Sequence, residues 1–437
     1  MIRARARRRR RPSACATAFA ALALASLLGG CASAPAGGGT PAVASAVVAE
    51  GAVDTTNQVL VLLEPGPTML WQRKSGELAA QYRLTQVAAW TVGSLDDTPC
   101  VIYQAAPGAD VRQVLRRLGA DPQVSVAQPV QRFRVLAAPP PPVPSGQAPN
   151  KSGYNDPYAD LQRDVAELSL SAVHRVATGK GVKVGIVDTG LEVDHPDLRG
   201  RVAGIANYVE SGERSFTSDV HGTAVAGILA AASNNQVGIV GVAPEALLYA
   251  FKACWQEPPA SRQAVCDSYT LARAVDAALG QGVQVLNLSL SGPPDPFLSR
   301  LLGAALAKRT VVVAAYDGAL ADGGFPASRD GVLGVGAEAR AGDPRGAVGK
   351  PPLVGPAVDV LSTAPRASYD FFSGSSFAAA HVAGVAALLL ERKPSLTAAE
   401  VRELLVASGR RDAAEVPHID PCAALAKLEG RAICAAP

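Results

Sequence analysis

Three short stretches contain the residue types of nucleophilic catalysis: Asp188 in a Val-Asp-Thr-Gly stretch, His221 in His-Gly-Thr, and Ser376 in Gly-Ser-Ser. A serine hydroxyl attacks a carbonyl carbon when a histidine takes its proton and a buried carboxylate orients the imidazole. Ser376 precedes a run of small and apolar residues, 377–390, which predicts a buried helix with Ser376 in its first turn. Unpaired backbone N–H groups there favour a developing negative charge. Taken alone, the stretch favours ordinary helix N-caps at Ser375 and Ser376, so this motif points to catalysis only beside the other two.

The segments that must position these residues alternate between strand-like and helix-like patterns, which predicts a mostly parallel α/β sheet. In such sheets ligands bind beyond the carboxyl ends of the strands, and Asp188, Ser289 and Asp317 fall at those ends. The predicted strands are 183–187, 247–252, 283–289 and 310–315, and the predicted helices are 221–232, 270–280, 297–308 and 376–392, with a surface helix over 397–407.

Two competing chemistries lack their partners in the sequence. An aspartic protease needs two carboxylates that share one proton, but no second Asp-Thr-Gly or Asp-Ser-Gly accompanies Asp188. A phosphate-binding loop of the Gly-x-x-x-x-Gly-Lys type is also absent from the sequence. A nucleotide-driven enzyme is therefore not expected.

Six blocks of the chain together resemble the subtilisin family of serine proteases: DTGLEVDHPDL, HGTAVAGILAA, NNQVGIVGVAP, VLNLSLSGP, FPAS and GSSFAAAHVAG. The resemblance extends from Tyr154 to about Leu428. It implies a subtilisin-like three-layer α/β fold and the chain order Asp, His, Ser that the family is known for. It assigns Asp188 as the orienting carboxylate, His221 as the general base and Ser376 as the nucleophile, whose backbone N–H faces the oxyanion.

The resemblance also assigns the substrate-binding residues. The segment 288–292 would pair with the substrate backbone as an added strand. The residues expected to line the substrate are Ser289, Leu290, Ser291 and Tyr316. His174, His195, His381 and His418 are outside the triad positions and are expected to be packed or solvated.

The sequence departs from the family at the oxyanion and beside it. Asp317 stands where the family has an asparagine whose amide donates to the oxyanion. Losing such a donor typically costs on the order of 3 kcal/mol, unless a protonated Asp317 or another group donates instead. Tyr316 and Ser291 both replace glycines beside the substrate, which predicts a narrow pocket that prefers Ala, Ser or Gly before the cleaved bond.

The N-terminal region has the pattern of an export signal. Seven arginines precede residue 31 with no acid among them, and removing them changes the formal net charge from +3 to −4, which argues against nucleic acid as a partner. The apolar stretch 14–28 completes a signal peptide over residues 1–30. Leu28-Gly29-Gly30-Cys31 resembles a bacterial lipobox, so Cys31 is the predicted lipidation site, followed by a flexible tether over 31–57. Plain secretion with a cut near residues 32–34 is the alternative.

Cysteine usage agrees with an exported protein. After Cys15 in the signal and Cys31, five cysteines remain. Pairing neighbours gives the disulfides Cys254 with Cys266 and Cys422 with Cys434, although other connectivities would close longer loops. Cys100 is left over, and the spacings do not favour a zinc site.

Residues 58–137 form a further predicted unit, a small α+β domain with strands over 59–63, 101–104, 124–127 and 133–136 and a helix over 109–118. In position and pattern it resembles the inhibitory prodomain that precedes subtilisin-like peptidases. A Pro-rich linker over 138–153 separates it from the peptidase domain over 154–437. Self-cleavage between Leu136 and Tyr154 would release the enzyme from its anchor.

A structural calcium site is expected from three separate blocks that look like the strong calcium site of the family. Carboxylate, amide and carbonyl oxygens are the ligands that calcium prefers. The alternative is that these residues only shape turns and loops. The predicted ligands are Asp156, Asp197, Ser233, Asn235, Val237 and Ile239.

The sequence therefore predicts an exported serine endopeptidase that hydrolyses peptide bonds through an acyl-enzyme on Ser376. Its predicted partners are peptide or protein substrates, its own prodomain and a membrane reached through Cys31, facing the periplasm or the cell surface. The alternatives are a catalytically weak binding or scaffold lipoprotein with the same fold, and a protease that processes only itself.

Overall fold

The computed structural model describes residues 57–137, 152–209, 216, 218–257, 263–338 and 348–434. The predicted signal peptide, Cys31, nearly all of the tether and most of the Pro-rich linker lie outside the described residues. No helix in the described ranges has both the length and the apolar character needed to cross a membrane.

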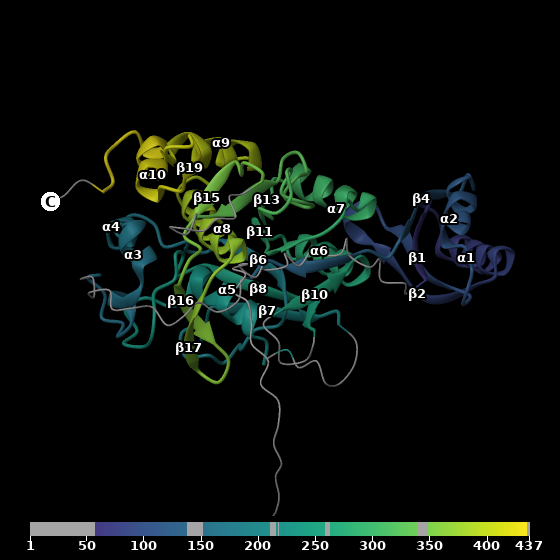
Figure 1. Ribbon diagram of the computed structural model, residues 1–437, viewed down its shortest axis with the longest axis horizontal. Coiled ribbons are helices and arrows are strands. Elements are labelled where there is room, and N and C mark those ends of the chain that lie inside the picture. Colours follow the sequence, from purple (N-terminus) through teal and green to yellow (C-terminus); the bar gives the residue numbers. More distant parts are fainter. Residues whose placement is uncertain are drawn as a thin grey trace, which may run out of the picture. The chain divides into compact units, whose positions relative to one another are not determined.

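A nine-stranded sheet forms the centre of the larger part of the chain, in the order β18-β19-β15-β14-β13-β11-β6-β8-β7 (Figure 1). All its neighbouring strands are parallel except β18 and β19. The middle strands are continuous apolar runs, as expected where helices cover both faces of a sheet. The strands are β6 Lys183–Asp188, β7 Val202–Asn207, β8 Leu247–Lys252, β11 Val285–Leu288, β13 Val311–Ala315, β14 Leu333–Ala337, β15 Leu353–Gly355, β18 Arg410–Arg411 and β19 Pro417–His418.

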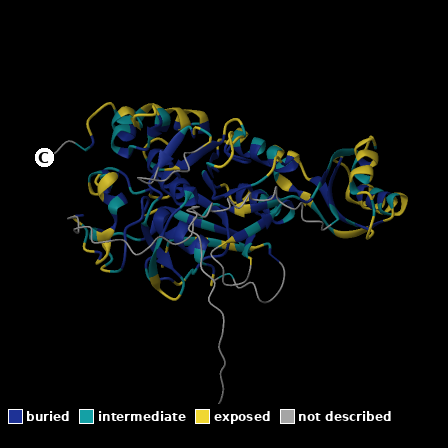
Figure 2. Cartoon of the chain, in the orientation of Figure 1, coloured by how far each residue is buried: buried dark blue, intermediate teal, exposed yellow. Residues whose placement is uncertain are grey.

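Two apolar cores lie on the two faces of this sheet. One contains the helices α5 (Val220–Ala230) and α8 (Ser375–Arg392), with α9 (Ala398–Ser408) and α10 (Pro421–Glu429) outside them. The other contains α6 (Ser268–Gly280) and α7 (Pro296–Ala307). The helices next to the sheet are mostly buried, whereas exposed residues gather on outer helices such as α9 (Figure 2). This helix–sheet–helix arrangement is the subtilisin-like three-layer α/β fold that the sequence predicts.

The predicted elements of this part differ from the observed ones mainly at their ends. The strand expected over 283–289 is shorter, β11, because residues 281 and 282 still close the turn after α6. At its other end Ser289 leaves the sheet and turns its carbonyl toward Leu136. The segment between Cys422 and Cys434 is largely helical, and Asp420 caps the N-terminus of this helix, α10.

Residues 57–137 contain a small antiparallel sheet in the order β2-β3-β1-β4 with two helices. The sequence prediction missed α1 and β2. A separate core of this region surrounds Val61, Leu78 and Tyr103. The elements are β1 Gln58–Leu63, α1 Thr68–Tyr82, β2 Leu84–Val92, β3 Thr98–Ala105, α2 Val111–Gly119 and β4 Val124–Pro129.

The chain leaves this small sheet after β4. The next strand, β5 (Arg132–Val135), belongs to another sheet, in the order β12-β5-β10-β9. The other three strands, β9 (Cys254–Gln256), β10 (Ala264–Asp267) and β12 (Leu290–Ser291), all come from the larger part of the chain. β5 pairs antiparallel with β10 on one side and with β12 on the other. A segment from before the linker is therefore inserted between two strands that follow it.

Both expected disulfides are present. Cys254–Cys266 links the paired strands β9 and β10, and Cys422–Cys434 fixes the chain after α10. Cys100 is a free thiol, and burial in β3 raises its pKa.

Candidate active site

The three predicted catalytic side chains come together at one edge of the central sheet. Asp188 is the last residue of β6, His221 lies in the first turn of α5, and Ser376 lies in the first turn of α8. His221 Nδ1 is 2.7 Å from Asp188 Oδ1, which also accepts a hydrogen bond from the backbone N–H of Thr189. All three catalytic side chains are almost completely buried. A carboxylate that holds the imidazole in this way fixes its tautomer and leaves Nε2 free to act as a base.

The hydroxyl of Ser376 does not yet contact that base. Ser376 Oγ donates to the carbonyl oxygen of Ser289 at 2.9 Å and accepts from the backbone N–H of Leu136 at 3.1 Å. His221 Nε2 is buried, with no hydrogen-bond partner among the described residues. The Ser376 hydroxyl therefore points toward Ser289 and Leu136, and it donates no hydrogen bond to His221 Nε2.

Leu136 occupies the place of a substrate residue next to Ser376. Its carbonyl oxygen accepts a hydrogen bond from the backbone N–H of Ser376 at 3.3 Å, and its own N–H lies 3.3 Å from the carbonyl of Ser289. Before it, Val135 pairs with Leu290. A carbonyl held at the N-terminus of α8, beside a serine hydroxyl, is in the position where an attacked carbonyl gains stabilisation of its oxyanion.

The rest of this segment is also held in the manner of a bound peptide. Phe133, only 2% exposed, packs its ring 6.2 Å from that of Phe325, measured between centroids. Gly292 allows this, because a Cβ added there would lie 2.3 Å from the ring of Phe133. Main-chain pairing together with pockets for alternate side chains is how an added strand is recognised.

Comparison with known proteins identifies this arrangement. The model of the subtilase family matches residues 179–420 of the chain.

The chain belongs to the subtilase family.

Relatives with described activities agree with this assignment. The chain is 37% identical to subtilisin DY of Bacillus licheniformis over 238 residues, which cover 52% of this chain and 83% of that protein. It is 35% identical to an intracellular serine protease of Paenibacillus polymyxa over 245 residues, 53% of this chain and 73% of that protein. This subtilase is therefore a serine endopeptidase.

A solved structure supports the fold alone. The crystal structure of fervidolysin from Fervidobacterium pennivorans, a keratinolytic enzyme related to subtilisin, superposes with a TM-score of 0.68 at 21% identity. The match covers 84% of this subtilase and 60% of fervidolysin.

Asp317 does not have the contacts of an oxyanion donor. Its Oδ1 accepts from the backbone N–H of Ala319 at 3.1 Å, and its Oδ2 forms an ion pair with Arg134 Nη2 at 2.6 Å. Both oxygens thus act as acceptors in these contacts. In this structure the Asp317 carboxylate pairs with an arginine of the segment that ends at Leu136, and its oxyanion role stays a prediction.

Three of the four predicted substrate residues lie along the same segment. Ser289 and Leu290 contact it through the backbone, and Ser291 pairs with Arg134. Tyr316 is buried, and its hydroxyl donates to the carbonyl of Ala321. The residue of the chain next to Ser376 is Leu136, and the expected preference for Ala, Ser or Gly stays a prediction.

Two charged residues beside the triad were missed by the sequence prediction. Lys252, the last residue of β8, pairs with Asp219 Oδ2 at 2.5 Å, and both are buried. The same oxygen accepts from the backbone N–H of Gly190 at 2.9 Å. Burial raises the pKa of the Asp219 carboxyl, and Lys252 opposes that shift. The sequence signal that could have indicated this pair is Lys252 at the end of the apolar strand β8. The pair ties the start of the His221 helix to the ends of two strands.

A second histidine–carboxylate contact supports the helix that carries Ser376. His381 Nε2 lies 3.1 Å from Asp164 Oδ2, and its Nδ1 lies 2.8 Å from the carbonyl oxygen of Phe377. Both side chains are buried. As expected from the sequence, His381 is a packed residue, here joining α8 to α3 (Arg163–Glu167).

Four of the predicted calcium residues, Ser233, Asn235, Val237 and Ile239, lie in the loop after α5, and the other two, Asp156 and Asp197, contact it. Asp156 accepts from the backbone N–H groups of Asn234 and Asn235 at 2.7 and 3.0 Å. Asp197 accepts from the Asn235 amide at 3.0 Å and from the Ile239 N–H at 2.9 Å. The Asn235 side-chain oxygen accepts from the N–H of Val237 at 2.8 Å. Within the described ranges, no group of three or more His, Cys, Asp or Glu could hold a metal ion.

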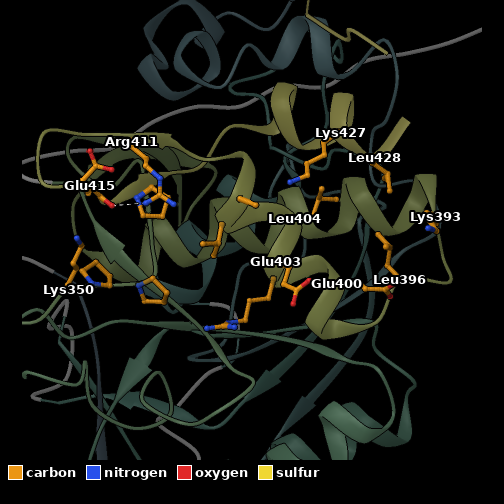
Figure 3. Close-up of a pocket in the computed structure, with 16 residues that line it drawn as sticks. Lys350, Lys393, Leu396, Glu400, Glu403, Leu404, Arg411, Glu415, Lys427 and Leu428 are labelled. Atoms are coloured by element: carbon orange, nitrogen blue, oxygen red, sulfur yellow. Dashed lines mark hydrogen bonds between the residues drawn. The ribbon is translucent and has the colours of Figure 1, made fainter. Parts of the chain in front are cut away.

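A cavity of about 950 Å³ lies elsewhere, against α9, α10 and the short strands β18 and β19 (Figure 3). Lysine and arginine side chains such as Lys350 and Arg411 line it together with acids such as Glu403 and Glu415. It contains none of the predicted site residues, and its mixed charges do not select one kind of ligand.

Proposed function

We propose that this subtilase cleaves peptide bonds with Asp188 as the orienting carboxylate, His221 as the general base and Ser376 as the nucleophile. The observation that carries the proposal is the seating of the Leu136 carbonyl on the backbone N–H of Ser376, beside its hydroxyl. A binding module does not need a buried histidine–carboxylate pair next to a serine held in that position.

The reaction begins with rotation of the Ser376 hydroxyl from the Ser289 carbonyl toward His221 Nε2. Nε2 takes the proton as Oγ bonds to the substrate carbonyl carbon, and the negative charge on the carbonyl oxygen is stabilised by the N–H of Ser376. Breakage of the C–N bond passes the proton from His221 to the leaving amine and leaves an acyl-enzyme. Water, deprotonated by His221, then releases the acyl group and restores the serine.

We propose that the unit predicted over 58–137 is an inhibitory prodomain, and that the enzyme ends it at Leu136 by cleaving its own chain between Leu136 and Ala137. The proposal is supported by the hydrogen bonds of Leu136 to Ser289 and Ser376. N-terminal sequencing of the purified protein tests it. The expected mature chain begins at Ala137, whereas the Ser376→Ala variant stays uncut. A cut elsewhere, or a cut that persists in the variant, contradicts it.

We also propose that the protein is exported and anchored through a lipid on Cys31. The support is the arginine-rich apolar start and the Leu-Gly-Gly-Cys stretch of the sequence. Cleavage after Leu136 would separate the peptidase from that anchor. Labelling with a fatty acid analogue, compared between wild type and Cys31→Ser, is expected to mark only wild type, and only in its uncleaved form or its N-terminal fragment. Label on the peptidase fragment would contradict this arrangement.

Subtilases commonly bind calcium, and we propose a structural calcium ion at the loop formed by residues 233–239. The side-chain oxygens of Asp156, Asp197 and Asn235 converge on this loop. Each Asp156 oxygen accepts one N–H bond, and carboxylate and amide oxygens are the donors that a hard cation takes. The ion would hold the loop to the chain around Asp156 and would take no part in bond cleavage.

A protease that acts only on itself is the second candidate. It is favoured by the ion pair between Arg134 and Asp317, which helps to retain the segment in the site. A fluorophosphonate, which reacts with an activated serine, separates the candidates when added after processing. Rapid labelling of wild type but not of Ser376→Ala supports an enzyme that accepts further substrates. Processed protein that never labels supports self-cleavage alone.

A further inference from the structure

We infer that Asp317 is a specificity residue that selects substrates with arginine or lysine as the third residue before the cleaved bond. The inference rests on the proposed function, because it takes the segment that ends at Leu136 as the image of a bound substrate. Counting back from the bond between Leu136 and Ala137, Val135 is the second residue and Arg134 is the third.

The contact has the geometry of a charge-specific subsite. Arg134 Nη2 lies 2.6 Å from Asp317 Oδ2, and Arg134 pairs through its backbone with Ser291, so strand pairing fixes its distance from the carboxylate. The Asp317 side chain is only 8% exposed, whereas that of Arg134 is 54% exposed. The acid therefore belongs to the wall of the site, and the arginine reaches it from the segment that must leave.

Departure of the segment leaves the acid needing a new partner. The backbone N–H of Ala319 still donates to Asp317 Oδ1, but Asp317 Oδ2 loses Arg134, the partner that the structure shows for it. A buried acceptor without a partner is costly, and hydrogen bonds to charged groups are the stronger ones. A substrate with a basic residue at this position restores the pair, whereas a neutral residue leaves it unmade and an acid adds repulsion.

A second arginine of the same segment provides a matched control. Arg132 pairs with Glu257 at 2.5 Å, but these side chains are 35% and 48% exposed. An ion pair in water contributes little, because both charges stay hydrated when it breaks. The two arginines thus have the same charge on the same strand, and the acid in the ion pair is buried for Arg134 and half exposed for Arg132.

The test uses the processed enzyme and quenched fluorescent peptides with the sequence of residues 131–138. In wild type, replacing the arginine that corresponds to Arg134 by glutamine is expected to lower kcat/KM by about 10- to 100-fold. Glutamate in the same place should lower it further, and lysine should restore most of it. Replacing the arginine that corresponds to Arg132 should change kcat/KM less than about threefold.

The enzyme variant Asp317→Asn should reduce the ratio of rates for the arginine and glutamine peptides toward one, and Asp317→Lys should make the glutamate peptide the better substrate. Because each ratio is taken within one enzyme, it does not depend on the overall rate of the variant. Equal rates for all peptides in wild type, or an unchanged ratio in Asp317→Asn, would overturn the inference while leaving the peptidase intact. Failure to hydrolyse any peptide, with no fluorophosphonate labelling, would overturn the proposed function and this inference together.

Discussion

Ser376 Oγ donates a hydrogen bond to the carbonyl oxygen of Ser289, 2.9 Å away, while His221 Nε2, which must receive its proton, has no hydrogen-bond partner in the part of the chain that the structure describes. The same hydroxyl accepts from the N–H of Leu136. The segment that occupies the site thus also holds the nucleophile away from its base. Attack requires rotation of one side chain, because Asp188 and His221 are already joined.

Ser376→Ala should abolish both self-processing and hydrolysis of peptides. Removal of a catalytic serine of this kind lowers kcat on the order of 10⁶-fold. The loss is no larger because the oxyanion donor and the binding contacts remain. The full-length chain should accumulate, seen by mass spectrometry, with an unchanged circular dichroism spectrum. Processing at the wild-type rate would rule out Ser376 as the nucleophile.

Asp188→Asn should lower kcat by about 10⁴-fold with little change in KM. Asp188 Oδ1 accepts from both His221 Nδ1 and the Thr189 N–H, and an amide in its place favours the wrong imidazole tautomer. Steady-state kinetics on one peptide provides the measurement. Asp164→Asn is the control, because Asp164 contacts His381 and not His221. An equal loss in both variants would show that the effect comes through the fold.

Lys252→Met should destabilise the folded protein by about 3 to 5 kcal/mol, because it leaves Asp219 buried without its cation. Denaturant unfolding is best measured in the Ser376→Ala background, which prevents self-digestion. The double variant Lys252→Met, Asp219→Leu should recover part of the loss, since the uncompensated charge is gone. A double variant no more stable than Lys252→Met would show that the loss comes from packing.

Stability should fall as the pH drops below about 6.5, the pKa of histidine in an unfolded chain, partly through His174. Its Nδ1 lies 2.7 Å from the Tyr154 hydroxyl and its Nε2 lies 2.9 Å from the carbonyl of Val242. Burial lowers the pKa of His174, so the unfolded state takes up a proton before the folded state does. Its stabilising effect is present above pH 6.5 and is lost below it. Thermal midpoints between pH 7 and 5 should fall less steeply in His174→Gln, and parallel curves would exclude this residue.

Chelation of calcium should lower the thermal midpoint of the wild type, because a ligand that binds only the folded state stabilises it. Asp197→Asn should reduce that response, as it removes one of the charged ligands. Restoring calcium in excess should recover the midpoint of wild type. Identical midpoints with and without a chelator would mean that the N–H bonds to Asp156 and Asp197 hold the loop unaided.

The sequence predicted the elements that are continuous and buried. The strands β6, β8 and β13 and the helix α8 are mostly apolar runs, and α6 has one buried face, so the local pattern located them to within two residues. The two disulfides close short local loops, so the sequence also predicted them correctly. The helix α1 and the strand β2 were missed because β2 is half exposed and α1 lacks a side-chain cap.

The contacts that define the substrate site were beyond the sequence for a different reason. Leu136 and Ser376 are 240 residues apart, and Arg134 and Asp317 are 183 residues apart. No local sequence pattern predicts that residues so far apart in the chain contact each other. Family analogy assigned Asp317 by its position in the sequence alone, whereas the contact of its side chain with Arg134 is visible only in the structure.

The insertion of β5 between β10 and β12 has a consequence for what the enzyme can digest. When this strand departs, the two flanking strands face each other across a gap one strand wide. A polypeptide fills it only if several consecutive residues are fully extended, so a helix or a tight turn must first unfold. Cleavage should therefore report the local flexibility of a target as much as its sequence, and a well-folded protein would be cut only in its loosest loops or after partial unfolding.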